Sequence, residues 1–149
     1  MPEVRHDLTT CSLNYTIMAI GGKWKPFIVW YLHAALPDSC RYGELKRHIP
    51  WDISHKMFSQ QLQELERDNI VVRTEYFEKP LRVEYSLTEQ GKLLAPVILY
   101  MRDWGAAFGE KFGYEALVQR THGALVDNCL YYGYDSESLK KKVQIKFEL

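Results

Sequence analysis

Five of the polar side chains between residues 55 and 63, near the start of a helix-like pattern, lie away from its apolar stripe and are able to hydrogen-bond. They are His55, Lys56, Ser59, Gln60 and Gln63. In duplex DNA, glutamine pairs with adenine, lysine pairs with guanine or holds a phosphate, and serine reads several base edges. Recognition helices present their N-terminal residues to these edges in the major groove. A solvated helix face would carry the same residue types, so this set alone leaves both interpretations open.

An amphipathic helix must position these side chains. Phe58, Leu62 and Leu65 repeat at i, i+4 and i+7, which predicts one buried helical stripe. Ser54 is a good N-cap for this helix. Asn69 should end it, because asparagine tolerates the left-handed backbone conformation that closes many helices. The polar set therefore lies on the opposite side from the predicted core, concentrated in the first turns.

Two strand-like runs follow this helix. Residues 72–77 and 82–87 are rich in β-branched and aromatic side chains, and residues 78–81 separate them. This pattern predicts a hairpin. Lys79 and Arg82 flank its turn, which in a winged helix lies on the phosphate backbone or in the minor groove. In any other setting the two side chains would be ordinary exposed cations.

Two helices are predicted near the start of the chain. Apolar residues recur at helical spacing over residues 13–20, and Gly21 and Gly22 should end that helix by taking the left-handed conformation. The second helix covers about residues 23–35. Its apolar side chains surround nearly the whole circumference, so we expect a fully buried central helix.

A short helix and a long one complete the predicted order. The short helix covers about residues 42–47 and stops before Pro50. The long helix follows the hairpin, begins after the capping residue Thr88, contains Pro96 and runs to about Phe112. Two short helices followed by a two-stranded hairpin predict a winged helix-turn-helix, a mainly α fold with a small β wing (α+β).

Positive charge gathers modestly around the predicted reading helix. The chain holds 19 Lys and Arg against 19 Asp and Glu, so its formal net charge is zero. Zero net charge excludes a bulk polycation that grips any polyanion. Within residues 41–60, however, basic residues outnumber acidic ones. The predicted phosphate contacts are Arg41, Lys46, Arg47, Lys79 and Arg82.

The sequence offers no motif for an enzyme, a metal site or a cofactor. Its five histidines lack HxxxH and HExxH spacing, and its three cysteines form no CxxC pair. No GxSxG, Walker or GxGxxG motif is present. The polar N-terminus and the short apolar runs predict neither a secretory signal nor a membrane span. We therefore expect a cytoplasmic protein with reduced thiols, no metal, no cofactor and no membrane contact.

Several motifs occur in order and at family-like separations. They are Ile20-Gly21-Gly22-Lys23-Trp24, Glu44-Leu45, Gln61-Leu62-Gln63-Glu64-Leu65-Glu66, Val83-Glu84-Tyr85-Ser86-Leu87-Thr88 and Trp104-Gly105. From about residue 11 to residue 112 the chain resembles the HxlR family of bacterial winged-helix regulators, which are relatives of MarR. The resemblance implies a homodimer on a palindromic DNA operator, with long N- and C-terminal helices packing across the two-fold axis. It also implies a reader at Ser54–Gln63 and a wing tip at Lys79–Arg82.

The resemblance divides the chain into two parts. Residues 1–112 are expected to form the winged helix-turn-helix domain. Residues 113–149 lie outside the family pattern and form a C-terminal extension without an assigned role. Residues 143–149 alternate between apolar and polar side chains, which indicates a strand that needs a partner strand.

Cys11 stands where many members of this family carry a cysteine, and in some of them that thiol senses oxidants or electrophiles. Such chemistry requires a thiolate, which a helix N-terminus and nearby cations favour. Arg5, His6 and Lys23 are the candidate cations. The alternative is a small side chain that packs near the dimer interface. Cys40 and Cys129 are candidate partners for an oxidised Cys11, or ordinary thiols.

Two functions of different classes remain open from the sequence. The first is a homodimeric DNA-binding transcriptional regulator, with an oxidant or small electrophile as its candidate effector. The second is a winged-helix module that binds proteins and has no DNA function, which the neutral net charge slightly favours. Salt dependence separates them, because DNA binding weakens steeply as salt concentration rises.

Overall fold

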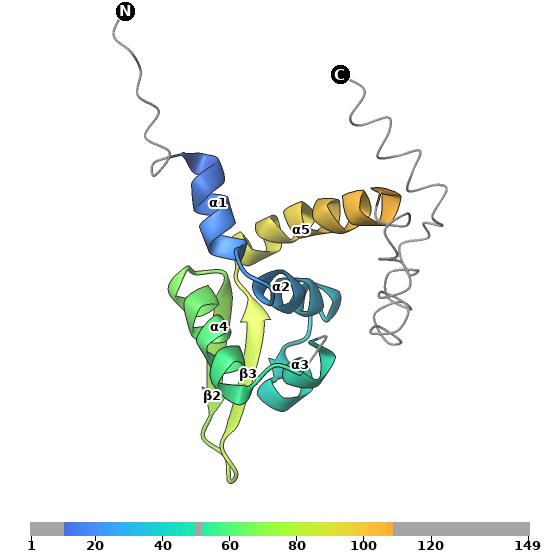
Figure 1. Ribbon diagram of the computed structural model, residues 1–149. Coiled ribbons are helices and arrows are strands. Elements are labelled where there is room, and N and C mark those ends of the chain that lie inside the picture. The colour runs from blue at the N-terminus through green and yellow to red at the C-terminus, as the bar shows by residue number, and fades with distance from the viewer. Residues whose placement is uncertain (1–10, 50–51, 109–149) are drawn as a thin grey trace, which may run out of the picture.

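The computed structural model describes residues 11–49 and 52–108 (Figure 1). Within these residues the elements follow the predicted order, with an additional short strand. In chain order they are α1 (Ser12–Ile20), α2 (Lys25–Ala34), β1 (Cys40–Arg41), α3 (Tyr42–His48), α4 (His55–Arg67), β2 (Val71–Tyr76), β3 (Arg82–Leu87) and α5 (Glu89–Phe108). The mainly helical fold with a small antiparallel sheet confirms the predicted fold class.

Helix α2 lies at the centre and contacts α3, α4, α5 and β3. Its buried side chains include Ile28, Val29 and Leu32, which join the apolar stripe of α4 in one core. The prediction of burial all round was wrong for the aromatic face, because Trp30 and Tyr31 are only partly buried. Side chains of other elements cover part of this face: the guanidinium carbon of Arg102, on α5, lies 5.9 Å from the Trp30 ring centroid.

The sheet has the strand order β1-β3-β2, and both pairings are antiparallel. In the hairpin, Val71 pairs with Leu87 and Tyr76 pairs with Arg82. Strand β1 was expected to be loop. Its two residues are too few to show the alternation that predicts a strand, and they become a strand only by pairing with β3, where Cys40 lies opposite Tyr85.

Local hydrogen bonds set both ends of α4. The Ser54 hydroxyl accepts a hydrogen bond from the Met57 backbone N–H at 3.1 Å, as expected for an N-cap. Asn69 has a left-handed φ of 57° and allows the Ile70 N–H to reach the Leu65 carbonyl at 2.9 Å. Both predicted capping roles are therefore confirmed.

Thr88 connects the end of the hairpin to the start of α5. Its hydroxyl donates to the Asn69 carbonyl at 2.6 Å and accepts from the Gly91 N–H at 2.9 Å, which confirms the predicted cap. At the end of α1, the left-handed glycine is Gly22, with φ of 98°, while Gly21 is extended. The prediction of a glycine termination was right, although only the second glycine uses the left-handed conformation.

Helices α1 and α5 expose apolar side chains on one end of the molecule (Figure 1). Four large hydrophobic residues of α1 are more than half exposed: Leu13, Tyr15, Ile17 and Met18. The expected long N-terminal helix has only nine residues, whereas α5 has 20 and contains Pro96 as predicted. Helical periodicity correctly predicted α1, but within the described chain little covers its apolar face.

Residues 113–149, including the strand predicted at their end, lie outside the described part of the chain. Among residues 11–49 and 52–108, no helix is both long and apolar enough to cross a bilayer.

Candidate nucleic-acid interface

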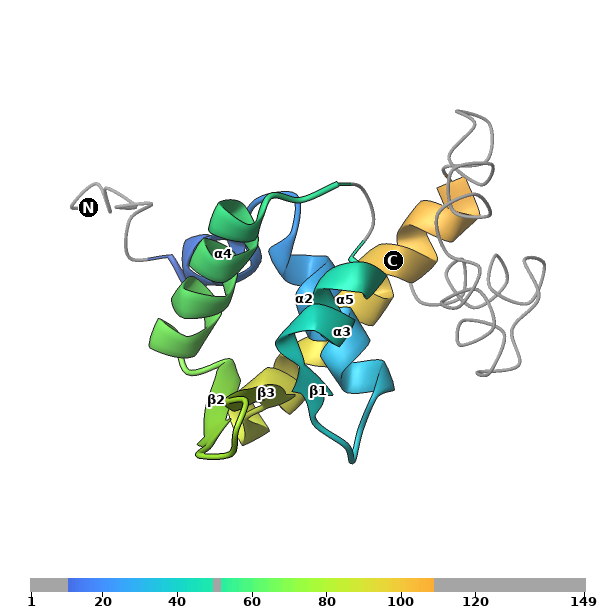
Figure 2. The same cartoon turned by 90° about the horizontal axis from the view of Figure 1, so that it is seen from below.

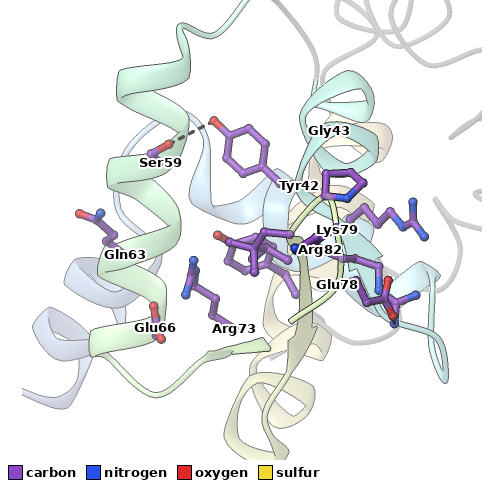
Figure 3. A pocket seen from close by; sticks show the side chains of 14 residues that line it. Tyr42, Gly43, Ser59, Gln63, Glu66, Arg73, Glu78, Lys79 and Arg82 are labelled. Atoms are coloured by element: carbon purple, nitrogen blue, oxygen red, sulfur yellow. Dashed lines mark hydrogen bonds and ion pairs between the residues drawn. The ribbon is translucent and has the colours of Figure 1, made fainter. Parts of the chain in front are cut away.

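Helices α3 and α4 and the β2–β3 hairpin lie at the end of the molecule away from α1 and α5 (Figures 1 and 2). An open groove of about 620 Å³ separates α4 from the hairpin. Polar and basic side chains line much of this groove, several of which are labelled in Figure 3. They include Arg41, Tyr42, Ser59, Gln63, Arg73, Lys79 and Arg82.

The predicted reader side chains occupy the outer surface of α4. His55, Lys56, Gln60 and Gln63 are exposed, and Ser59 is half-buried. Phe58, Leu62 and Leu65 lie in the core, as the periodicity predicted, and the polar Gln61 is also buried between them. The helix therefore turns its polar face outward. Ser59 and Gln63 line the groove, whereas His55, Lys56 and Gln60 are not among its lining residues.

Two of the predicted readers share a contact that the sequence did not suggest. The Tyr42 hydroxyl, at the start of α3, lies 3.1 Å from Ser59 Oγ (Figure 3). The same hydroxyl lies 3.1 Å from His55 Nδ1. The Tyr42 ring also stacks on the His55 ring, with centroids 5.9 Å apart. No sequence pattern linked Tyr42 to the reader, because its partners are 13 and 17 residues away.

The Gln60 amide is held along its own helix. Its Nε2 donates to Glu64 Oε1 at 3.1 Å, and the other oxygen of Glu64 lies 2.7 Å from Lys25 Nζ on α2. The Lys25 side chain is only 6% exposed. Hydrogen bonds from Lys25 and then Gln60 lower the pKa of the Glu64 carboxyl. This ion pair fastens α4 to the central helix.

The predicted phosphate contacts fall into separate groups. Arg41 and Lys79 are exposed and both line the groove, Arg41 from β1 and Lys79 from the hairpin turn. Lys46 and Arg47 lie on α3 and are not among the groove-lining residues. Within the described chain, no ion pair involves any of these four side chains, so their charges are available to an anion.

Arg82 differs from the other predicted cations, because two carboxylates already surround it. Its guanidinium lies 3.3 Å from Glu78 and 3.5 Å from Glu84, and it sits 4.1 Å from the Tyr76 ring centroid. The two acidic neighbours compensate its charge. Arg82 therefore shapes the hairpin more than it adds positive charge to the groove.

Arg73 is a groove residue that sequence reasoning missed. It lies on β2 opposite Tyr85 and forms an ion pair with Glu75. The hydrogen bond to Glu75 is the main reason why the pKa of its guanidinium is raised. Strand alternation could have placed Arg73 and Tyr85 on one face, but the sequence gave no sign that this face borders α4.

The two described cysteines have opposite environments. Cys11 is exposed and occupies the N-cap position of α1, where its carbonyl accepts from the Tyr15 N–H at 3.1 Å. Cys40 is buried, and burial raises the pKa of its thiol to about 11. Lys23 is one of the cations proposed to favour the Cys11 thiolate. Its Nζ lies 4.7 Å from the centroid of the Trp24 ring.

Arg5, His6 and Cys129 lie outside the described residues. Among the residues that the structure describes, no cluster of three or more His, Cys, Asp or Glu side chains could hold a metal ion.

Comparison with known proteins identifies the family. The family model described as HxlR-like helix-turn-helix matches residues 19–112. The uncharacterized HTH-type transcriptional regulator YdzF of Bacillus subtilis (strain 168) is 48% identical over 96 residues, which cover 64% of this chain and 85% of that protein.

Two solved structures extend the comparison to the fold. The redox regulator HypR in its reduced form is 36% identical and covers 70% of this chain and 99% of its own, with a TM-score of 0.62. The diamide-treated YodB of B. subtilis is 33% identical and covers 66% of this chain and 94% of its own, with a TM-score of 0.53. The chain therefore belongs to the HxlR-like helix-turn-helix family of DNA-binding transcriptional regulators, which are not enzymes.

Proposed function

We propose that this protein regulates transcription by binding a specific palindromic operator as a homodimer. The observation that carries the proposal is the common orientation of the exposed polar face of α4 and the hairpin on either side of one groove. With α4 in the major groove and the hairpin over the neighbouring minor groove, the intervening sugar-phosphate strand would follow this groove.

The roles of individual residues follow from this placement. The Ser54–Gln63 segment supplies the base contacts, from His55, Lys56, Ser59, Gln60 and Gln63. Phosphate contacts come first from Arg41 and Lys79, which are exposed and line the groove. Lys46, Arg47 and Arg82 contribute less, since the first two do not line the groove and the third faces Glu78 and Glu84.

The homodimer is supported by the exposed apolar side chains of α1 and α5. Exposing this many large hydrophobic side chains to water is unfavourable in free energy, and burying them against a second copy would remove this cost. Trp104 and Phe108 stack on each other at 5.6 Å and are still about half exposed. A two-fold dimer would also present two copies of α4 to a palindromic operator.

The proposal assigns redox sensing to Cys11. Its support is the exposure of this thiol at the start of α1, beside the proposed dimer surface, and the similarity to structures described as redox regulators. A peroxide would transfer one oxygen to the thiolate sulfur, giving a sulfenic acid and releasing water or an alcohol. Condensation with a second thiol would release water and form a disulfide. Either product would shift the two subunits and change the spacing of the α4 helices.

We assign DNA binding to residues 1–112 and treat residues 113–149 as a separate extension. The support for this boundary is the family match, which ends at residue 112.

A gel-shift experiment tests the proposed function. The purified protein is mixed with the promoter DNA that flanks its own gene, with excess competitor DNA, before and after diamide. Specific binding that is lost on oxidation and restored by dithiothreitol supports the thiol switch. Cys11→Ser should keep binding and lose the response.

Two further measurements separate DNA binding from a protein-binding module. Operator affinity should fall steeply as salt rises, because phosphate contacts release counterions. Lys56→Ala or Gln60→Ala should weaken operator binding while the fold stays intact. If neither substitution changes affinity or sequence preference, α4 is not the reader. If a selection from random-sequence DNA also recovers no site, the protein-binding module becomes the better explanation.

A further inference from the structure

The Tyr42 side chain lies between the buried core and two predicted base-reading residues. Its ring packs on Phe58, which is fully buried, with centroids 5.1 Å apart and planes inclined by 59°. On its other side the ring stacks on His55 at an angle of 14°. The core therefore fixes the ring, and the ring in turn supports the exposed imidazole.

The hydroxyl of Tyr42 connects the two side chains directly. It lies 3.1 Å from His55 Nδ1, 3.1 Å from Ser59 Oγ and 3.4 Å from the His55 carbonyl oxygen. His55 and Ser59 are one helical turn apart on α4, and Tyr42 belongs to α3. This contact is a bridge across the helix-turn-helix that ends on two predicted base readers.

We propose that Tyr42 is a positioning residue for sequence recognition, a role that rests on the proposed DNA-binding function. A hydroxyl donates one hydrogen bond and accepts others, and a neutral imidazole has one donor and one acceptor nitrogen. When Tyr42 donates to Nδ1, His55 carries its proton on Nε2 and Ser59 donates to Tyr42. When Nδ1 donates instead, Tyr42 donates to Ser59, and the Ser59 proton is free to point outward.

A third arrangement, in which Tyr42 donates to the His55 carbonyl at 3.4 Å and accepts from both Nδ1 and Ser59, leaves an acceptor on each side chain. In the first two arrangements the hydrogen-bonding groups that His55 and Ser59 offer to DNA are coupled. In the first arrangement His55 offers a donor at Nε2 and Ser59 offers an acceptor. In the second arrangement the two roles are exchanged. Both arrangements hold the side chains in place before DNA arrives, which removes part of the ordering cost of binding. Without the Tyr42 hydroxyl, each side chain would orient independently and discriminate less between bases.

The test compares Tyr42→Phe with the wild type in a selection from random-sequence duplex DNA. The variant keeps the ring contacts with Phe58 and His55 and removes only the hydroxyl. We expect its preference for the selected site over an unrelated duplex to fall by about five- to tenfold, the effect of losing one or two hydrogen bonds. Its affinity for the unrelated duplex and its melting temperature should stay close to those of the wild type.

The positions at which base preference is lost provide a second readout that a merely structural role would not produce. These DNA positions should coincide with those at which His55→Ala and Ser59→Ala lose base preference. They should differ from the positions at which Lys56→Ala loses it. Tyr31→Phe is the matched control, because Tyr31 also stacks on a histidine, His48, with centroids 4.3 Å apart. That control should leave the selected sequence unchanged.

The outcomes distinguish this proposal from the function on which it rests. If the wild type selects a site and Tyr42→Phe selects the same site with the same discrimination, the positioning role is wrong and the DNA-binding function stands. If Tyr42→Phe weakens all duplexes equally or lowers the melting temperature in parallel, Tyr42 acts only structurally. If the wild type selects no site, both proposals fail.

Discussion

Burial decides which of the two described cysteines can react. A thiol must lose its proton to act as a nucleophile. With a pKa of about 11, Cys40 would be only about one part in a thousand thiolate at about pH 8. It is also covered by the core. Cys11, by contrast, is exposed at the start of α1.

Alkylation should therefore modify Cys11 much faster than Cys40 in the folded protein. Iodoacetamide labelling at about pH 8, followed site by site with mass spectrometry, measures both rates in one sample. In denaturant the two rates should converge, because the burial that raises the Cys40 pKa is lost. Equal rates in the folded state would contradict the buried environment of Cys40.

A second residue-level prediction concerns the ion pair between Lys25 and Glu64. Removing the carboxylate leaves a buried ammonium without its charged partner, so Glu64→Gln should cost about 2 kcal/mol of unfolding free energy at about pH 7. The folded state lowers the Glu64 pKa below 4.5. This contribution is therefore complete above the unfolded pKa and is lost as pH falls through the folded pKa.

Urea denaturation of the wild type and Glu64→Gln across a pH series tests both the size of this stability contribution and the sign of its pH dependence. The difference between the two proteins should shrink as the solution is acidified below about pH 4. Gln63→Glu offers a comparison, because it adds a carboxylate at an exposed neighbouring position. A difference that grows toward low pH would rule out this account of the pair.

At the scale of elements, the start of α5 lies unusually close to the segment that joins α4 to β2. A Cβ built on Gly91 would lie 2.1 Å from the Ile70 carbonyl oxygen, a backbone atom that cannot move alone. The Thr88 hydrogen bonds hold the same junction together. A glycine is needed here because two backbones approach each other, and the approach sets where α5 leaves the hairpin.

Gly91→Ala should destabilise the protein by about 2 kcal/mol or more, since overpacking against fixed backbone forces the elements apart. Gly105→Ala is the matched control in the same helix, because a Cβ there meets nothing within 4 Å. That control should be neutral or stabilising by about 0.5 kcal/mol, as alanine favours helix more than glycine does. Thermal unfolding of both variants checks the contrast, and similar melting temperatures would refute it.

Neighbouring carboxylates in the hairpin reduce the positive charge that a basic residue contributes to the groove. Lys79 and Arg82 looked equivalent from their places beside the turn. Glu84 lies two residues from Arg82 on the same face of β3, and the turn brings Glu78 near Arg82 as well. Positive charge at the groove therefore comes more from Arg41 and Lys79 than from Arg82.

At the scale of the whole molecule, the two ends have different chemistry. One end carries the groove between α4 and the hairpin, and the other carries the exposed apolar side chains of α1 and α5 (Figure 1). A dimer through α1 and α5 would leave both copies of α4 free to bind DNA. This separation of surfaces allows a change near Cys11 to reach the reading helices through the subunit arrangement.

Charge placed on the apolar end should dissociate the dimer without unfolding the chain. Met18 and Leu93 are 68% and 79% exposed, so Met18→Glu and Leu93→Glu remove little packing within one subunit. Sedimentation should give the mass of two chains for the wild type and one chain for the double variant. Phe77→Glu is the control, because Phe77 is 91% exposed on the hairpin side and its replacement should leave the mass unchanged. A double variant that stays dimeric would place the interface elsewhere.

Local patterns in the sequence determined most of the elements and the reading face. The stripe of Phe58, Leu62 and Leu65 oriented α4, while Ser54 and Asn69 marked its ends. These predictions succeeded because helix periodicity and capping depend on residues within one or two turns of each other. The motifs also led to the correct family. The structural roles of the predicted base and phosphate contacts stay predictions until DNA binding is measured.

The tertiary structure decided which side chains meet across elements. The sequence could not show that Tyr42 bridges His55 and Ser59, or that residues 40–41 form a third strand. Each of these contacts joins at least one pair of elements or depends on strand register, and the free energy that forms it comes from packing of the whole core. Local spacing predicts which face of an element is buried, but only the packed fold determines what that face, or its polar opposite, touches.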